Sequence, residues 1–306
     1  MPMPEPKVRP PRTLAADEIR QFQNDGVLVL RNVLPASRWA TLQQELVDRV
    51  ENAIRDAVVQ GVLSAAQSFS EAGFASRLAL ASASCADPLW IWRRHFSNLK
   101  PVTRGMFELR TAPELLSIVG SLIGPELFAH PQYALRTKLP DHAESALPWH
   151  QDIGYLEAAE ARNTQIVNCW VPLVSTTKDN GCMQVLVGSH QLGVFAHSKV
   201  RDTERLNKGI PAVDLPDLPA IECEVEPGDV VLLDESIVHR SLPNRTNTVR
   251  WSVDTRYSRI GLPTGRARVP GFIAQSHDNP GTVTGSWEMW AHSLAAAGVD
   301  ANGNRY

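Results

Sequence analysis

The apolar positions of the first 125 residues recur mainly at the spacing of amphipathic helices. A helix is predicted over 13–24, and a short strand follows at 27–31. Residues 35–59 carry apolar side chains three or four positions apart, which predicts a long amphipathic helix. Residues 60–125 are mostly helical in pattern and include a further helix at 113–122. We expect this part of the chain to be scaffold, because it shows no obvious chemistry.

From about Leu127 the pattern changes to short strands separated by turn signals. Asn180-Gly181 suits a tight turn, and Pro227-Gly228-Asp229 leads into an apolar run. This alternation predicts an all-β sandwich or barrel. Strands are predicted near 127–138, 146–151, 164–174, 182–187, 220–226, 229–234 and 247–259.

Residues 191–219 interrupt this β pattern. They lack strand alternation and mix Arg201, Arg205 and Lys208 with several prolines. An insertion of this length is typical of a lid or binding loop. Its charges could meet an anionic group, and a solvated loop accounts for them equally well.

Composition and charge narrow the class of protein. The 306 residues carry 30 Lys and Arg against 33 Asp and Glu, a formal net charge of -3, which gives no electrostatic reason to expect nucleic acid or an anionic membrane as a partner. No apolar stretch is long enough to span a membrane, and the Pro-rich start at 1–12 has no apolar signal region. We therefore expect a cytoplasmic protein whose partners are small molecules.

The cysteines do not indicate a metal or redox motif. Cys85, Cys169, Cys182 and Cys223 are widely spaced and include no Cys-x-x-Cys pair. They are expected to pack as small apolar side chains.

His150-Gln151-Asp152 is the tripeptide that suggests chemistry. In an extended strand, residues i and i+2 point to the same side, so the imidazole and the carboxylate can converge on one ion while Gln151 points away. A facial triad of two histidines and one carboxylate suits non-haem Fe(II) and leaves positions free for cosubstrate and oxygen. The motif is weak alone, since a loop histidine beside a solvated aspartate would look the same.

Two further features strengthen the metal-site hypothesis. His239 follows directly after the predicted strand 229–234. In the strand 247–259, alternation places Arg250, Ser252, Asp254 and Arg256 on a polar face opposite an apolar one. A guanidinium on that face can bind a carboxylate with two hydrogen bonds. A solvent-facing polar side would explain the strand alone, but the combination with both histidines favours a cosubstrate site.

With these motifs in this order, the chain resembles the phytanoyl-CoA dioxygenase family of Fe(II)- and 2-oxoglutarate-dependent oxygenases. The resemblance is carried by Phe22-Gln23-Asn24-Asp25-Gly26-Val27, Trp149-His150-Gln151-Asp152, Asn180-Gly181-Cys182-Met183, Gly188-Ser189-His190, Pro227-Gly228-Asp229, His239 and Arg250. It implies a mainly β fold with flanking α-helices, in which N-terminal helices pack on a double-stranded β-helix, or jelly-roll, core of cupin type.

The chain is expected to divide into a tail and one domain. The prolines of residues 1–12 disfavour a helix and predict a mobile tail. Residues 13–306 are expected to form a single dioxygenase domain, either monomeric or homodimeric. Within it we expect a helical scaffold (13–125), a jelly-roll core (about 126–260) and a C-terminal extension (261–306).

Site roles follow from the same resemblance. His150, Asp152 and His239 are implied as ligands of Fe(II), with 2-oxoglutarate and O2 as cosubstrates. Arg250 would bind the distal carboxylate of 2-oxoglutarate, and Ser252 fits an Arg-x-Ser pattern of related oxygenases. The other implied cosubstrate residues are Gln132, Trp170 and Ser241.

The implied activity is oxidation of a substrate C–H bond, with release of succinate and CO2 from 2-oxoglutarate. Hydroxylation is the default, with desaturation, epoxidation and ring closure as alternatives. Asp152 argues against halogenation, because related halogenases carry a small residue there. Two other classes remain: a zinc hydrolase, which has no use for Arg250 as a carboxylate anchor, and a non-catalytic jelly-roll binding protein. The sequence does not select a substrate among natural-product skeletons, amino acids and acyl derivatives.

Other residues near the motifs are not assigned to the site. His190 is interpreted as part of a turn that shapes the barrel. Neither His130 nor His95 is selected by any spacing rule. Trp149 should point away from its neighbour His150 and so belong to the core.

Overall fold

The computed structural model describes residues 11–142, 146–156, 163–201, 206–266 and 269–300. Its α-helices are α1 (Ala16–Asp25), α2 (Ala40–Val59), α3 (Phe74–Ala83), α4 (Trp90–His95), α5 (Arg104–Arg110), α6 (Pro113–Ile123) and α8 (Trp287–Ala296). Its strands are β1 (Val27–Leu30), β2 (Leu127–Ala129), β3 (Ala134–Lys138), β4 (Ile166–Pro172), β5 (Met183–Leu186), β6 (Ser198–Arg201), β7 (Leu206–Gly209), β8 (Ala220–Cys223), β9 (Val230–Asp234), β10 (His239–Ser241), β11 (Arg250–Arg259) and β12 (Phe272–Gln275).

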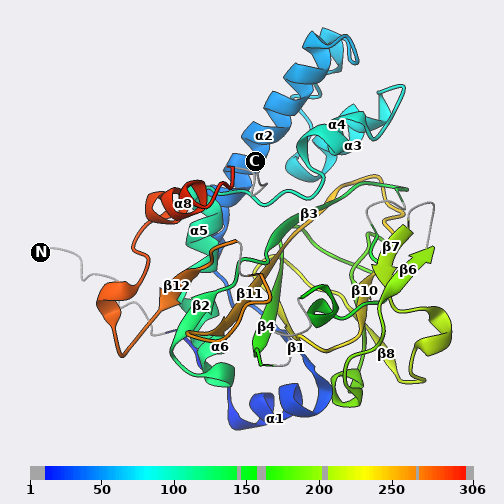
Figure 1. The fold of residues 1–306 in the computed structure, drawn as a ribbon. Coiled ribbons are helices and arrows are strands. Elements are labelled where there is room, and N and C mark those ends of the chain that lie inside the picture. The colour runs from blue at the N-terminus through cyan, green and yellow to red at the C-terminus, as the bar shows by residue number, and fades with distance from the viewer. Residues whose placement is uncertain (1–10, 143–145, 157–162, 202–205, 267–268, 301–306) are drawn as a thin grey trace, which may run out of the picture.

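Two antiparallel sheets form the centre of the molecule. The larger sheet runs in the order β1-β9-β4-β11-β2-β12, and β3 also pairs with β11. The smaller sheet has the order β10-β5-β8. Helices α2, α5, α6 and α8 lie toward one side of the strands, and β8 and β10 lie toward the opposite side (Figure 1). Sequence neighbours are therefore often in different sheets, as in a jelly roll, and the expected mainly β fold with flanking helices is confirmed.

The larger sheet is buried on both faces because its strands alternate between two clusters of side chains. On β9, Val230 and Leu232 pack with the helices, whereas Val231 and Leu233 pack between the two sheets. On β11, the helix-facing positions are apolar and include Trp251, which stacks on Phe74 of α3 at 5.1 Å between ring centroids. The opposite face of β11 is polar and turns toward the space between the sheets, as its alternation predicts.

The Asn180-Gly181 turn brings β5 against the end of β3. Gly181 has φ +93°, and a Cβ atom there would lie 2.5 Å from the Leu242 carbonyl oxygen and 2.6 Å from Cδ of Lys138. Only glycine satisfies both the left-handed backbone and this close approach. The turn therefore fixes how closely the smaller sheet approaches a lysine of the larger one.

Several predicted boundaries are wrong in an informative way. The strand predicted at 127–138 is two strands, β2 and β3, interrupted at 130–133. The strand predicted at 146–151 is reduced to an isolated bridge at His150, and Asp152 begins a 3-10 turn instead of continuing the strand. Pro148 cannot donate a ladder hydrogen bond, which accounts for part of this loss.

The insertion 191–219 does contain regular structure, contrary to its sequence pattern. Strands β6 and β7 form a two-stranded antiparallel hairpin, and 202–205 between them lie outside the described residues, as does Arg205. The mobile tail predicted for 1–12 also falls almost wholly outside them. In the C-terminal extension the structure adds β12 and α8, whose apolar side chains join the helical side of the core.

Among the described residues, no helix combines the length and the apolar character needed to cross a membrane.

Gly105 lies where α5 approaches α2 most closely. A Cβ atom there would be 2.3 Å from the Leu42 backbone nitrogen, so Gly105→Ala should force the helices apart and lower the free energy of unfolding by about 1–3 kcal/mol. Gly120→Ala in α6 is the matched control, because its nearest atom is 4.0 Å away. We expect urea titration to show destabilisation for Gly105→Ala alone; equal effects would contradict the packing interpretation.

Candidate metal centre

His150 and His239 face each other across an antiparallel backbone bridge. The amide nitrogen of each donates to the carbonyl oxygen of the other at 2.9 Å. Opposed residues in such a pair project to the same face, and the two ring centroids are 4.2 Å apart. Backbone pairing thus places two imidazoles together, although the residues are far apart in the sequence.

Both imidazoles are oriented by the carbonyl two residues earlier. Nδ1 of His150 lies 2.8 Å from the Pro148 oxygen, and Nδ1 of His239 lies 3.0 Å from the Ile237 oxygen. A carbonyl only accepts, so each Nδ1 carries a proton, and in the neutral form of each ring Nε2 is the nitrogen with the free lone pair. These carbonyls are the outer partners that metal-binding histidines require.

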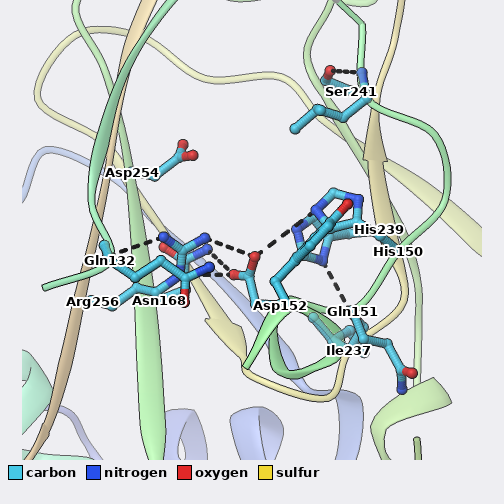
Figure 2. Close-up of polar contacts among 12 residues, drawn as sticks. Gln132, His150, Gln151, Asp152, Asn168, Ile237, His239, Ser241, Asp254 and Arg256 are labelled. Carbon is cyan, nitrogen blue, oxygen red and sulfur yellow. Dashed lines mark hydrogen bonds and ion pairs between the residues drawn. The ribbon is translucent and has the colours of Figure 1, made fainter. Parts of the chain in front are cut away.

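Asp152 reaches the histidines from the first residue of the 3-10 turn Asp152–Tyr155. Its Oδ1 lies 3.9 Å from Nε2 of His150. Arg256 donates to both carboxylate oxygens, from Nη2 to Oδ1 at 2.7 Å and from Nε to Oδ2 at 3.1 Å. Asn168 donates to Oδ2 at 2.7 Å. Two donors therefore saturate Oδ2, and Oδ1 is the oxygen nearer the imidazoles (Figure 2).

The electrostatics of the cluster favour a cation. Burial, with His239 adding to it, lowers the pKa of His150 to about 3, so this imidazole is neutral. Burial would raise the pKa of Asp152, but Arg256 and the two histidines outweigh it and hold this pKa well below its usual range. One ligand atom from each of His150, Asp152 and His239 can be chosen so that all lie within 4.8 Å of one another. Two imidazoles and an ionised carboxylate at this separation fit a divalent transition metal.

Gln151 points away from the metal ligands, as expected, and is fully buried (Figure 2). Its Nε2 donates to the carbonyl oxygens of Gly193 at 2.8 Å and Ser236 at 2.6 Å. Its Oε1 accepts from the Phe195 amide at 2.8 Å. Gln151 therefore links the insertion 191–219 to the segments that carry both histidines.

A pocket of about 120 Å³ opens beside the three candidate ligands. Of the residues predicted for the cosubstrate, Arg250, Trp170 and Ser241 line it. Ser252 is fully buried and accepts a hydrogen bond from Nη1 of Arg250. Gln132 is not among the described residues that line the pocket. Its backbone carbonyl accepts a hydrogen bond from Arg256 at 3.1 Å.

Lys138 is a pocket residue that the sequence analysis missed. It is the Cα partner of Arg250 across β3 and β11, and its Nζ donates to Ser241 Oγ at 2.8 Å and to the Leu242 carbonyl. The alternation of Arg136 and Lys138 within the predicted strand 127–138 could have indicated a basic face, which the pairing of β3 with β11 places on the same side as Arg250.

Arg250 and Lys138 are buried cations, and neither makes an ion pair with a carboxylate among the described residues. Burial lowers the pKa of Arg250 to about 10, and burial together with Arg250 lowers the pKa of Lys138. The Nε atom of Arg250 has no hydrogen-bond partner in the described structure. Buried basic side chains without a carboxylate partner are costly, so the pair is suited to an incoming carboxylate.

The remaining histidines stay outside the cluster. Nε2 of His190 lies 3.1 Å from the Gln23 carbonyl, beside Gly26. His130 contacts the Thr264 carbonyl at 2.7 Å, and Nε2 of His95 lies 3.0 Å from a carboxylate oxygen of Asp56. Trp149 packs beneath the guanidinium of Arg240, with Cζ 4.6 Å from the ring centroid.

Comparisons with known proteins agree with this geometry. A family model described as phytanoyl-CoA dioxygenase (PhyH) matches residues 22–252. A probable phytanoyl-CoA dioxygenase of Caenorhabditis elegans is 26% identical over 259 residues, covering 81% of this chain and 77% of that protein. The non-haem monooxygenase ThoJ, solved in its apo form, has a TM-score of 0.60 at 20% identity and covers 92% of this chain and 94% of its own.

A second solved structure is the epimerase SnoN in complex with Fe3+, alpha ketoglutarate and nogalamycin RO. It has a TM-score of 0.52 at 17% identity, covering 82% of this chain and 87% of that chain. At these identities the solved structures establish the shared fold.

Removing the Arg256 guanidinium should weaken metal binding without removing a ligand. In Arg256→Gln, Asp152 loses its two-point anchor, and we expect the dissociation constant for Co(II) or Fe(II) to rise about tenfold to a hundredfold. Anaerobic titration calorimetry measures this, with Arg104→Gln as control, because Arg104 is exposed and pairs with Glu108. An unchanged metal affinity in Arg256→Gln would show that Asp152 needs no anchor.

Proposed function

The chain belongs to the phytanoyl-CoA dioxygenase (PhyH) family, and from this premise we propose that His150, Asp152 and His239 hold the Fe(II) of its active site. The family and its structural relatives are non-haem, Fe(II)- and 2-oxoglutarate-dependent oxygenases, so this chain is an oxidoreductase of that class acting on a small molecule. What carries the residue assignment is the convergence of two free Nε2 atoms and one ionised carboxylate within 4.8 Å.

The ligand set leaves room for 2-oxoglutarate. Three protein ligands on one face of an ion leave the remaining positions for cosubstrate and oxygen. Saturation of Oδ2 by Arg256 and Asn168 supports binding of the ion through Oδ1 of Asp152 alone. A carboxylate restricted to one oxygen does not take up a further position on the metal.

Arg250 and Lys138 are the proposed anchor of the distal 2-oxoglutarate carboxylate. Both cations are buried in the pocket, and Ser241 and Ser252 carry hydroxyl groups that bond to them. The Trp170 ring lies 5.4 Å from Cζ of Arg250 and supports the guanidinium. Gln132 stays a prediction from the resemblance, with its side-chain Oε1 unpartnered among the described residues.

When bound, Fe(II) would activate O2, the oxidant, with 2-oxoglutarate as co-reductant: one oxygen atom would go into succinate as CO2 is released, and the other would oxidise the substrate. The chain orients the donors: the Pro148 and Ile237 carbonyls fix the imidazoles, and Arg256 fixes Asp152. Trp92 and Phe96 contribute apolar surface to the pocket, which limits the water that can reach it.

Hydroxylation of an unactivated C–H bond is the proposed outcome, for a natural-product intermediate, amino acid or acyl derivative. The carboxylate of Asp152 supports oxygenation over halogenation. Desaturation, epoxidation and cyclisation would use the same site and are the alternatives. A zinc hydrolase leaves Arg250 and Lys138 without a reason to be buried, whereas a non-catalytic binding protein would be recognised by a function that survives His150→Ala.

Domain organisation, cellular compartment and partners are proposed as well. One apolar cluster runs from Leu14 to Val299, which supports a single domain over 13–306. All four cysteines are buried free thiols, as a reducing cytoplasm allows. The near balance of charges supports small-molecule partners over nucleic acid or an anionic membrane, and a monomer or homodimer remains the expected state.

Loss of any one ligand should abolish turnover. His150→Ala and Asp152→Ala remove donors, so Fe(II)-dependent formation of succinate from 2-oxoglutarate should fall by at least about a hundredfold. Succinate is measured with and without Fe(II), and Arg104→Gln provides the control. Hydrolysis with zinc in place of Fe(II)-dependent succinate formation would overturn the assignment.

Arg250→Gln should affect the cosubstrate and spare the metal. Losing charge-assisted hydrogen bonds of about 1.5–3 kcal/mol should raise the 2-oxoglutarate dissociation constant about tenfold to a hundredfold. Titration calorimetry on Co(II)-loaded protein measures it, and Co(II) affinity should stay within about twofold because Arg250 bonds to none of the metal ligands among the described residues. Unchanged 2-oxoglutarate affinity would exclude Arg250 as the anchor.

A further inference from the structure

We propose that the substrate is an anion whose carboxylate or phosphate group is bound by Arg136 at the mouth of the pocket. The inference rests on the proposed function and extends it, because it assigns a chemical class to the substrate.

Arg136 is the accessible cation of the pocket. It lies on β3 as the Cα partner of Ser252, so its side chain shares the face of Arg250 and the other polar residues of β11. Its side chain is 34% exposed, whereas Arg250 and Arg256 are buried. A ligand arriving from solvent therefore reaches Arg136 before it reaches the other two arginines.

The guanidinium of Arg136 has N–H donors that make no hydrogen bond among the described residues. Its Nε donates to Oδ2 of Asp254 at 2.6 Å, and no other hydrogen bond or ion pair of Arg136 is found among the described residues. A guanidinium has five N–H donors in a planar fork. Its terminal amino groups can therefore bind a second oxyanion in two-point geometry while Asp254 keeps its bond.

The charges of the pocket leave a place for this anion. Four cations line it, Arg136, Lys138, Arg250 and Arg256, against the two carboxylates of Asp152 and Asp254. A divalent ion and the two carboxylates of 2-oxoglutarate cancel each other. The loaded pocket would keep two excess positive charges, or one if Lys138 is neutral, so an anionic substrate is favoured and a cationic one is repelled.

Lys100 adds positive charge just outside the lining residues. It is half-buried, and burial together with the charges of Arg266, Arg136 and Arg256 lowers its pKa. Asn98 also lines the pocket and is exposed. An anion at Arg136 would relieve this repulsion, whereas a neutral group would leave it.

The test compares acids with a neutral analogue of the same skeleton. Protein loaded anaerobically with Fe(II) and saturating 2-oxoglutarate, which blocks the cosubstrate anchor, is titrated with cyclohexanecarboxylate, cyclohexyl phosphate and cyclohexanecarboxamide. We expect one of the acids to bind at least about tenfold more tightly than the amide, and the preferred acid tells carboxylate from phosphate. Equal affinities for both acids and the amide would overturn the proposal.

Variants separate anion binding from a structural role. Arg136→Gln should abolish the preference for acids, and Arg136→Lys should retain part of it. Asp254→Asn should strengthen acid binding, because it removes a competing carboxylate; a merely structural Arg136–Asp254 pair would not give this increase. The double variant Arg136→Gln/Asp254→Asn, which leaves neither charge unpaired, should also lack the preference. An acid preference that survives Arg136→Gln would overturn the proposal.

Metal and 2-oxoglutarate binding report on the proposed function separately. Both are measured before any probe is added, and both should stay within about twofold of the parent value in Arg136→Gln and in the surface control Arg104→Gln. If the parent protein failed to bind Fe(II) and 2-oxoglutarate, the proposed function itself would fail. If both bind and the acid preference is absent, only the assignment of an anionic substrate fails.

Discussion

The backbone bridge between His150 and His239 is the contact on which the site depends. Its two reciprocal hydrogen bonds of 2.9 Å join the segment between β3 and β4 to β10, an edge strand of the smaller sheet. Because the pairing register decides which side chains face each other, a shift by one residue would turn either imidazole away from the other. The nearby carbonyls of Pro148 and Ile237 then set the orientation of the rings, so position and tautomer both come from the backbone.

The buried arginines of this molecule differ in their surroundings. Nη1 of Arg110 has no hydrogen-bond partner in the described structure, but its guanidinium lies among aromatic rings. Arg110 donates to the His130 carbonyl at 2.6 Å and to Thr255 at 3.1 Å, and its Cζ lies 4.3 Å from the centre of the Tyr133 ring. Arg256 forms an ion pair with Asp152 and donates to both of its carboxylate oxygens. Arg250 bonds only to Ser252 among the described residues. A buried cation without a carboxylate partner lowers the stability of the fold. At Arg250 a carboxylate of the bound cosubstrate would supply that partner.

The middle residue of the His150-Gln151-Asp152 motif couples the metal centre to the insertion 191–219. The side chain of Gln151 forms hydrogen bonds with the backbone of Gly193 and Phe195. Its backbone N–H donates to Nε2 of His197 at 2.9 Å. Lys208 donates to the Gly154 carbonyl at 2.6 Å. The insertion therefore packs on the turn that presents Asp152. The ammonium group of Lys208 takes part in this contact.

The sequence by itself determined the mainly β fold, its flanking helices, and the three candidate metal ligands with Arg250. Periodicity indicated the strands of the larger sheet such as β9 and β11, because one face of each packs with the helices and the other lies toward the smaller sheet, and the motifs are local. It did not determine the turn at Asp152, the hairpin β6–β7 or the role of Lys138. Those depend on contacts between distant segments: Arg256 and Asn168 hold Asp152, and β11 places Lys138 beside Arg250. Pairing between strands far apart in the chain leaves no periodic signal, so only the tertiary structure could decide which charges are neutralised and which remain for a ligand.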